Sequence, residues 1–195
     1  LIDKIITVSK ELEQYLVRDV RLPAHKIQTV INGIETSRYA NRAKPVRLLD
    51  EFGISQSSRI LGTVARLDEV KDHLTMLKVF QLVREKYPDS RLFLVGDGPM
   101  RHVLSDYIGK NDLSSSVTIT GYRQDIPDML NLLDVFLLSS LSEGTSISLL
   151  EAMASGVPPV VTRVGGNVFI VDDRVDGLLV EPRAVGEMSD AIVHL

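Results

Sequence analysis

The sequence contains no cysteine and no tryptophan, and aromatic residues make up only 5% of its 195 residues. The absence of cysteine excludes disulfides, thiolate metal sites and a cysteine nucleophile, and it is compatible with a reducing cytosol. Long apolar runs are missing as well, because residues 132–138 are interrupted by Asp134 and fall far short of the roughly 20 residues that cross a bilayer. The sequence therefore predicts a protein with no transmembrane segment.

Neither sign of charge dominates the chain. Lysine and arginine together number 22 against 26 aspartate and glutamate residues, which gives a net charge of −4 without a block of like charges. Such a balance disfavours a polyanion-binding surface, so we expect no nucleic acid partner. The four histidines are far apart in the sequence and lack the spacing of metal ligands, so we expect no metal site.

Short apolar segments rich in β-branched residues alternate with amphipathic segments along the chain. This alternation is typical of a parallel sheet covered by helices on both faces. Strands are expected at residues 27–31, 59–64, 91–95, 117–120, 135–138, 159–162 and 177–180. Helices are expected at residues 71–86, 100–108, 126–133, 146–154 and 184–195. The predicted fold class is α/β, a Rossmann-like doubly wound parallel sheet whose ligands bind outside the carboxyl ends of the strands.

The two ends of the chain depart from this regular pattern. Residues 2–8 are expected to form an apolar strand directly after Leu1, and Ser9 is a suitable N-cap for a helix at residues 10–17. The charged residues 42–48 are expected to be irregular, and the last helical pattern stops without a glycine or asparagine cap. We interpret residues 1–25 as a connector from a preceding amino-terminal domain, and residues 26–195 as a compact domain truncated at its carboxyl end.

The loop after the second expected strand carries two cations, Arg66 and Lys71, just before a helix. A helix N-terminus adds a partial positive charge of roughly +0.5, so an anionic group such as phosphate would be bound well there. Alternatively, the two cations pair with the neighbouring acids Asp68, Glu69 and Asp72 on a solvated loop.

The loop after the fifth regular strand combines two carboxylates with a helix start. Glu143 lies in the loop, Thr145 or Ser146 is the expected N-cap, and Glu151 lies about one turn inside the helix. Free backbone amides at the helix start would bind an anion, and the flanking carboxylates would accept hydrogen bonds from hydroxyl groups. A ligand with phosphates in the middle and hydroxyls at both ends fits this pattern. The alternative is an ordinary capped helix with one buried apolar face.

Two further loops have both a functional and a structural interpretation. Residues 96–99, Gly-Asp-Gly-Pro, resemble half of a dinucleotide fingerprint, but Arg101 stands where the third glycine should be. A nicotinamide cofactor is therefore disfavoured, and a tight turn that starts a helix is the alternative. Arg123 and Asp125 could line a pocket for a nucleotide base, or they could lie on a solvated loop.

These motifs, taken in their order, resemble a known enzyme family. They are residues 62–67 (GTVARL) with Lys71, residues 96–99 (GDGP), Gly121-Tyr122, and residues 142–158, which run from SEGTS to ASGVP. From about residue 5 to residue 195 the chain resembles the carboxyl-terminal, donor-binding domain of family 4 (group 1) retaining glycosyltransferases, which have the two-domain GT-B fold. The resemblance implies that residues 26–195 are the Rossmann-like domain that binds a nucleotide sugar.

The resemblance also implies roles for individual residues. Arg66 and Lys71 would neutralise the diphosphate as the leaving group, and Glu143 would bind hydroxyls of the donor sugar. The amides of Gly144, Thr145 and Ser146 would lie near sugar and phosphate, and Glu151 would bind the ribose. The loop with Gly121, Tyr122, Arg123 and Ile126 would face the base. The sequence departs from the family at Asp72, which occupies a frequent glycine position, and at Thr145-Ser146, which replace an aromatic-glycine pair.

A donor half of this kind would serve a hexosyltransferase. The expected reaction transfers a hexosyl group from a nucleoside-diphosphate sugar to a carbohydrate or lipid-linked acceptor held by the amino-terminal domain. No permanently bound cofactor and no metal are expected, because the cations and the helix start replace the metal. The whole protein is expected in the cytoplasm, either free or peripheral to the membrane. The isolated chain is expected to bind nucleotide weakly and to transfer no sugar.

Other functions remain open at this level. An epimerase of sugar nucleotides has the same architecture, and so does a phosphorylase, although no lysine in the late strands could hold a Schiff-base cofactor. A non-catalytic nucleotide-binding module is the alternative from another class. Charge reversal at Lys71 would distinguish an enzyme, which would lose activity, from such a module.

Overall fold

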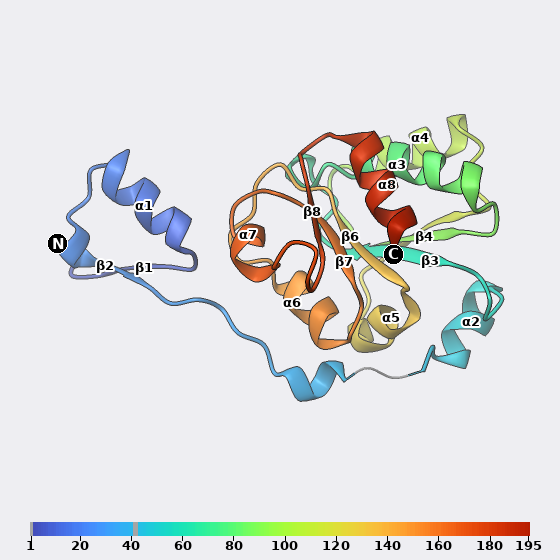
Figure 1. Cartoon of the computed structure of the whole chain (residues 1–195), viewed down its shortest axis with the longest axis horizontal. Coiled ribbons are helices and arrows are strands. Elements are labelled where there is room, and N and C mark those ends of the chain that lie inside the picture. Colours follow the sequence, from blue (N-terminus) through green and yellow to red (C-terminus); the bar gives the residue numbers. More distant parts are fainter. Residues whose placement is uncertain (1, 41–42) are drawn as a thin grey trace.

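The computed structural model describes residues 2–40 and 43–195 and shows a large α/β body with a small separate unit near the amino terminus (Figure 1). The body is built on a six-stranded parallel sheet. Its strands are β3 (Ile60–Val64), β4 (Arg91–Val95), β5 (Val117–Gly121), β6 (Val135–Leu138), β7 (Pro159–Thr162) and β8 (Leu178–Val180). Six of the expected strands are therefore confirmed to within one residue at either end.

The strands are ordered β5-β4-β3-β6-β7-β8 across the sheet. The chain proceeds outward from β3 to β5, crosses back to β6 on the other side of β3, and then proceeds outward to β8. In such a sheet the ligand crevice lies outside the carboxyl ends of the strands, at the point where the order reverses. That point is between β3 and β6. The doubly wound Rossmann-like fold class is thereby confirmed.

Helices cover both faces of the sheet (Figure 1). On one face pack α3 (His73–Lys86), α4 (Arg101–Lys110) and α8 (Val185–His194). On the other pack α2 (Val46–Phe52), α5 (Ile126–Leu132), α6 (Ile147–Ala154) and the short α7 (Asn167–Ile170). Strand side chains alternate between these layers: Phe93 and Val95 join the second group, whereas Leu92 and Leu94 join the first. This alternation buries both faces and explains why the strands have few polar residues.

The small amino-terminal unit pairs two short strands in parallel, β1 (Ile5–Thr7) and β2 (Ile27–Thr29), beside α1 (Lys10–Arg18). Ser9 is the N-cap of α1 and its hydroxyl accepts a hydrogen bond from the backbone amide of Leu12, at 3.2 Å. The expectation that residues 27–31 join the large sheet is wrong, because β2 pairs with β1 instead. Strand β1 lies in the expected connector, residues 1–25, and its partner β2 lies in the expected domain, residues 26–195. The boundary between connector and domain remains a prediction.

The start of α3 and the segment before β3 differ from the sequence-based expectation. The helix expected from residue 71 begins at His73, because Glu69–Lys71 form a 3-10 turn and Asp72 adopts φ +46°, in the left-handed region. A glycine at this position would adopt that angle without strain, and Asp72 tolerates it while capping α3. The segment expected to be irregular at 42–48 overlaps α2, whose Leu48 and Leu49 are buried against the sheet.

No helix among residues 2–40 and 43–195 is long and apolar enough to cross a membrane.

Candidate functional site

The reversal point of the sheet brings together the two loops that the sequence singled out. Lys71, after β3, places its Nζ 2.6 Å from Oε1 of Glu143, after β6. The two side chains are 20% and 6% exposed, so the pair lies at the base of the loops rather than on the open surface. A pair in this environment is screened less by salt than a surface pair is.

Serine side chains at the end of β6 hold the two loops in register. The hydroxyl of Ser139 lies 2.9 Å from the carbonyl oxygens of both Lys71 and Asp72, and the hydroxyl of Ser140 donates to Oε1 of Glu143 at 2.6 Å. The backbone amide of Leu141 donates to the carbonyl of Val70 at 2.8 Å. These serines are not among the site residues expected from the sequence. Two polar residues directly after an entirely apolar strand are the signal that could have identified them.

The carboxylate of Glu143 uses only one of its oxygens for these contacts. Both Lys71 and Ser140 bond to Oε1, and among the described residues Oε2 has no hydrogen-bond donor. The site therefore presents a fixed carboxylate with one oxygen available to an incoming hydroxyl group.

Arg66 lies at the same edge of the sheet, but its side chain is 69% exposed. Its Nε is 3.9 Å from Oδ2 of Asp68, which is the only ion pair of Arg66 among the described residues. The structure therefore does not bring the guanidinium into the contact between Lys71 and Glu143. Such an exposed pair contributes about 0–1 kcal/mol, so the side chain is free to reorient toward an anion.

The Gly-Asp-Gly-Pro loop after β4 supports the Arg66 loop. A Cβ on Gly96, where φ is +143°, would lie 2.0 Å from the carbonyl oxygen of Ala65, and one on Gly98 would lie 2.4 Å from that of Leu67. The amide of Leu67 donates to the carbonyl of Asp97 at 3.0 Å. Both glycines are explained by this close approach of two backbones, which agrees with the structural interpretation of the motif.

The N-terminus of α6 is formed as the sequence predicts. Ser146 is the N-cap, and its hydroxyl accepts a hydrogen bond from the amide of Leu149 at 3.4 Å. The preceding loop is packed against Gly165 and Gly166, whose added Cβ atoms would each lie 1.8 Å from a carbonyl oxygen of residues 143 and 144. Thr145 does not face the helix start: its hydroxyl donates to the carbonyl of Val8, in the small amino-terminal unit, at 2.5 Å.

Glu151 is contacted by a residue that the sequence analysis did not consider. The hydroxyl of Tyr39 donates to Oε1 of Glu151 at 2.6 Å. Tyr39 ends the 3-10 helix Thr36–Tyr39, and its ring belongs to the core cluster on the α6 side of the sheet. The hydrogen bond, followed by burial, raises the pKa of the Tyr39 hydroxyl above its usual value.

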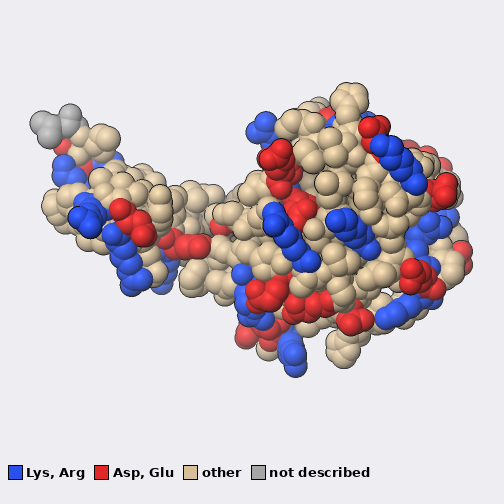
Figure 2. All heavy atoms as spheres, turned by 90° about the horizontal axis from the view of Figure 1, so that it is seen from above, with Lys and Arg blue, Asp and Glu red and all other residues tan. Residues whose placement is uncertain are grey.

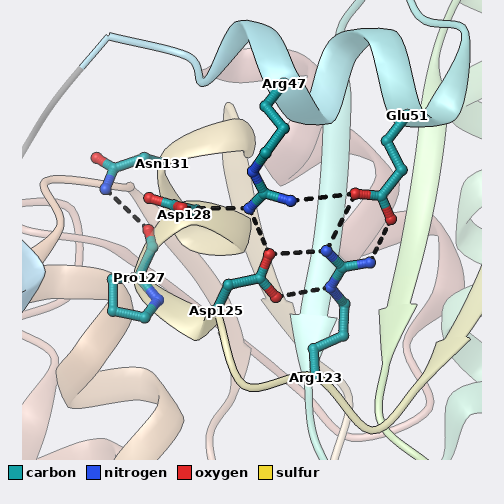
Figure 3. A network of polar contacts seen from close by, with 7 residues as sticks. All are labelled: Arg47, Glu51, Arg123, Asp125, Pro127, Asp128 and Asn131. Carbon is teal, nitrogen blue, oxygen red and sulfur yellow. Dashed lines mark hydrogen bonds and ion pairs between the residues drawn. The ribbon is translucent and has the colours of Figure 1, made fainter.

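The predicted base loop after β5 is held by a network of ion pairs (Figure 3). Arg123 bonds to Oδ1 and Oδ2 of Asp125 at 2.8 and 2.7 Å and to Glu51 of α2 at 2.5 Å, and its side chain is largely buried. Arg47 of α2 bonds to Asp125 at 2.6 Å and to Asp128 at 3.3 Å. Arg123 and Arg47 together hold the pKa of Asp125 well below its usual range.

These ion pairs limit which side chains of the predicted base loop can contact a ligand. The guanidinium of Arg123 is occupied by two carboxylates, so it does not point freely toward a ligand. Gly121 has φ +72°, Tyr122 is 83% exposed, and Ile126 begins α5 and packs against the core. Tyr122 is thus the most accessible side chain of the four predicted residues. The role of this loop in base binding remains a prediction.

Charged side chains of both signs are interspersed on the face of the molecule seen in Figure 2. This distribution agrees with the net charge of −4 in the sequence. Local pairs such as Lys71 with Glu143, rather than a broad field of one sign, therefore characterise the electrostatics of the described site.

Residues 58–195 match the family model described as "Glycosyl transferases group 1". The chain is 28% identical, over 98% of its length, to the Escherichia coli UDP-Gal:alpha-D-GlcNAc-diphosphoundecaprenol alpha-1,3-galactosyltransferase, of which it covers 51%. It is 32% identical, over 89% of its length, to the Bacillus anthracis N-acetyl-alpha-D-glucosaminyl L-malate synthase, of which it covers 45%. The chain thus spans about half the length of these curated relatives.

Solved structures show the same fold. A crystal structure of HepE from Anabaena in complex with UDP and glucose superposes with a TM-score of 0.88 at 22% identity, covering 98% of this chain and 53% of that one. The structure of HepE with UDP-glucose gives a TM-score of 0.87 at 23% identity, with the same coverage of both chains. The fold is therefore that of a GT-B carboxyl-terminal domain, as expected.

Proposed function

The chain belongs to the glycosyl transferases group 1 family, and from this membership we propose that it is the donor-binding part of a glycosyltransferase that uses a nucleoside-diphosphate sugar. The observation that carries the proposal is the contact between Lys71 and Glu143 at the reversal point of the sheet. A cation next to a carboxylate and a helix N-terminus offers partners for phosphate and for sugar hydroxyls side by side.

Each group has a distinct task in the proposed reaction. As the bond between the anomeric carbon and the diphosphate oxygen breaks, negative charge grows on the diphosphate. The ammonium of Lys71 stabilises this charge, and so does the guanidinium of Arg66 once it turns inward. Their attraction is stronger in the transition state than in the ground state, which is the condition for catalysis. The free oxygen of Glu143 orients the sugar by accepting a hydrogen bond from its hydroxyls.

The remaining assignments complete this proposal. Gly144, Thr145 and Ser146 supply backbone amides near the phosphates, Glu151 binds the ribose, and Gly121, Tyr122, Arg123 and Ile126 border the base. Structural neighbours with UDP or UDP-glucose bound support a nucleotide-sugar donor. We further propose a hexosyl donor, retention of configuration, and a carbohydrate or lipid-linked acceptor bound outside this chain. The Escherichia coli relative, a galactosyltransferase named for UDP-Gal and a diphosphoundecaprenol-linked sugar, supports the hexosyl donor and the lipid-linked acceptor.

Nucleotide titration tests the proposal directly. We expect millimolar UDP, GDP or ADP to shift the backbone amide resonances near Arg66, Lys71 and Glu151 of the 15N-labelled chain. The variant Lys71→Met should raise the Kd of the bound nucleotide at least tenfold, about 1.4 kcal/mol, because it removes a charge-assisted contact to phosphate. Lys78→Met, which removes an exposed lysine from α3, is the matched control and should leave the Kd unchanged.

Two results would contradict the proposal. One is the absence of any amide shift near these residues with all three nucleotides. The other is equal nucleotide affinity in Lys71→Met and Lys78→Met when both variants retain the amide dispersion of the folded protein.

A further inference from the structure

The segment that links the small unit to the body makes a specific contact with the predicted ribose-binding residue. Tyr39 and Glu151 are 112 positions apart in the sequence, yet their side chains meet at 2.6 Å. The Tyr39 residue is 9% exposed and its ring packs in the core cluster on the α6 side of the sheet. The ring thus anchors the hydroxyl, and the hydroxyl in turn defines where one oxygen of the carboxylate lies.

The carboxylate of Glu151, like that of Glu143, uses one of its two oxygens for contacts within the protein. Oε1 accepts from Tyr39, and no other hydrogen bond to this carboxylate is present among the described residues. A half-buried glutamate without the tyrosine would sample several rotamers, and ordering it on ligand binding costs side-chain entropy. A side chain already held by Tyr39 avoids most of that cost. It also keeps Oε2 available to an external donor.

We propose that Tyr39 is a positioning residue that orients the Glu151 carboxylate toward the vicinal hydroxyls on the ribose of a bound nucleoside diphosphate. Tyr39 thereby sets the preference for ribonucleotides over 2′-deoxyribonucleotides. This inference rests on the proposed function, because it takes Glu151 as the ribose ligand. Tyr39 does not touch the nucleotide itself. It acts through Glu151 alone.

Tyr39→Phe is the decisive variant because it removes the hydroxyl and keeps the buried ring. Tyr107→Phe is the matched control: the Tyr107 hydroxyl donates to Oε1 of Gln81 at 2.8 Å, on the opposite face of the sheet. We would measure the Kd of UDP and of 2′-deoxy-UDP by calorimetry for the whole 195-residue chain, both tyrosine variants, Glu151→Gln, and the double variant Tyr39→Phe/Glu151→Gln.

The quantity that should change is the ratio between the Kd of 2′-deoxy-UDP and the Kd of UDP. The unmodified chain and Tyr107→Phe should bind UDP about tenfold more tightly than 2′-deoxy-UDP, in line with one hydrogen bond to a charged acceptor. Tyr39→Phe should reduce this ratio about threefold or more, and should weaken the binding of UDP more than that of 2′-deoxy-UDP, which offers Glu151 only the 3′-hydroxyl. In the double variant the loss should be no larger than in Glu151→Gln alone, because the tyrosine acts only through the glutamate.

The outcomes separate this inference from the proposed function. A Tyr39→Phe variant with an undiminished ratio, while Glu151→Gln loses it, overturns the inference and leaves the proposed function intact. Tighter UDP binding by Tyr39→Phe also overturns it, since the hydroxyl would then compete with ribose for the carboxylate. A chain that shows no amide shift with UDP, GDP or ADP overturns both proposals together.

Discussion

At the scale of single residues, the site is characterised by carboxylates whose surroundings use one oxygen and leave the other available. Glu143 is held by Lys71 and Ser140, and Glu151 by Tyr39. In each case a neighbour fixes the side chain before any ligand arrives, which lowers the ordering cost of binding. The sequence pattern identified the two glutamates, but it contained no information about which neighbours orient them.

One buried residue beside this site should make stability depend on pH. His73, at the start of α3, is 2% exposed, and neither ring nitrogen has a hydrogen-bond partner among the described residues. Burial lowers its pKa from 6.5 to about 4, with a smaller lowering by Lys71 that is opposed by Asp68 and Asp72. Between these two pH values the unfolded chain therefore binds more protons than the folded chain.

We expect the free energy of unfolding to fall as the pH is lowered from 6.5 toward 4, by on the order of 2–3 kcal/mol from His73 alone. His73→Gln, which cannot titrate, should lack this part of the decrease, whereas the exposed His102→Gln should retain it. Urea denaturation at pH 7 and pH 4.5 measures the difference. Parallel pH profiles for the unmodified chain and His73→Gln would show that His73 titrates normally in the folded state.

At the scale of elements, α2 and the loop before α5 form one unit although they are far apart in the sequence (Figure 3). Arg123 is largely buried and bonds to both Glu51 and Asp125, whereas the side chain of Arg47 is 57% exposed. Arg123 should therefore contribute more to the stability of the fold than Arg47, because an exposed ion pair is weakened by solvent and by side-chain entropy.

We expect Arg123→Gln to lower the free energy of unfolding by roughly 2–3 kcal/mol, because it leaves two partly buried carboxylates with only the more exposed Arg47 as a cationic partner. Arg47→Ala should cost only about 0–1 kcal/mol, since its pairs are exposed. Urea denaturation of the two variants at neutral pH compares them directly. Equal losses would mean that the burial of Arg123 has no energetic consequence.

At the scale of the whole molecule, two features relate the small unit to the body. Residues 30–40 run from the small unit below the sheet in Figure 1, and the loop between β6 and α6 contacts the small unit directly. The hydroxyl of Thr145 donates to the carbonyl of Val8, next to β1. The loop proposed to bind phosphate therefore also holds the small unit against the body. The role of this unit as a connector between domains remains a prediction.

Thr145→Val should loosen the small unit without unfolding the sheet, because it removes a single hydrogen bond worth about 0.5–1.5 kcal/mol. We expect faster amide hydrogen exchange in α1 and β2 of this variant, together with unchanged exchange in β3 and β6. Thr118→Val, on β5 at the far edge of the sheet, is the matched control. Unchanged exchange in α1 would show that other contacts hold the unit in place.

The sequence by itself determined the fold class and nearly all the elements of the body. Apolar β-branched segments such as residues 91–95 and amphipathic ones such as residues 73–86 specify strand or helix through local periodicity, which needs no partner. The sequence also indicated which loops hold the site, because ligands of a parallel sheet bind outside the carboxyl ends of its strands. Residues 43–45 have no regular structure, as expected, and residue 42 lies outside the described part of the chain. The irregular interpretation was wrong only for residues 46–48, because α2 depends on burying Leu48 and Leu49 against a sheet that forms elsewhere.

Only the tertiary structure decided which groups meet. The pairing of β2 with β1, the contact of Tyr39 with Glu151, and the capture of Arg123 by Glu51 each join residues that are more than 20 positions apart. Periodicity and capping depend on residues within one or two helical turns, so they contain no information about contacts between distant residues. Long-range packing selects the partners, and in this protein it determines which oxygen of each site carboxylate remains free.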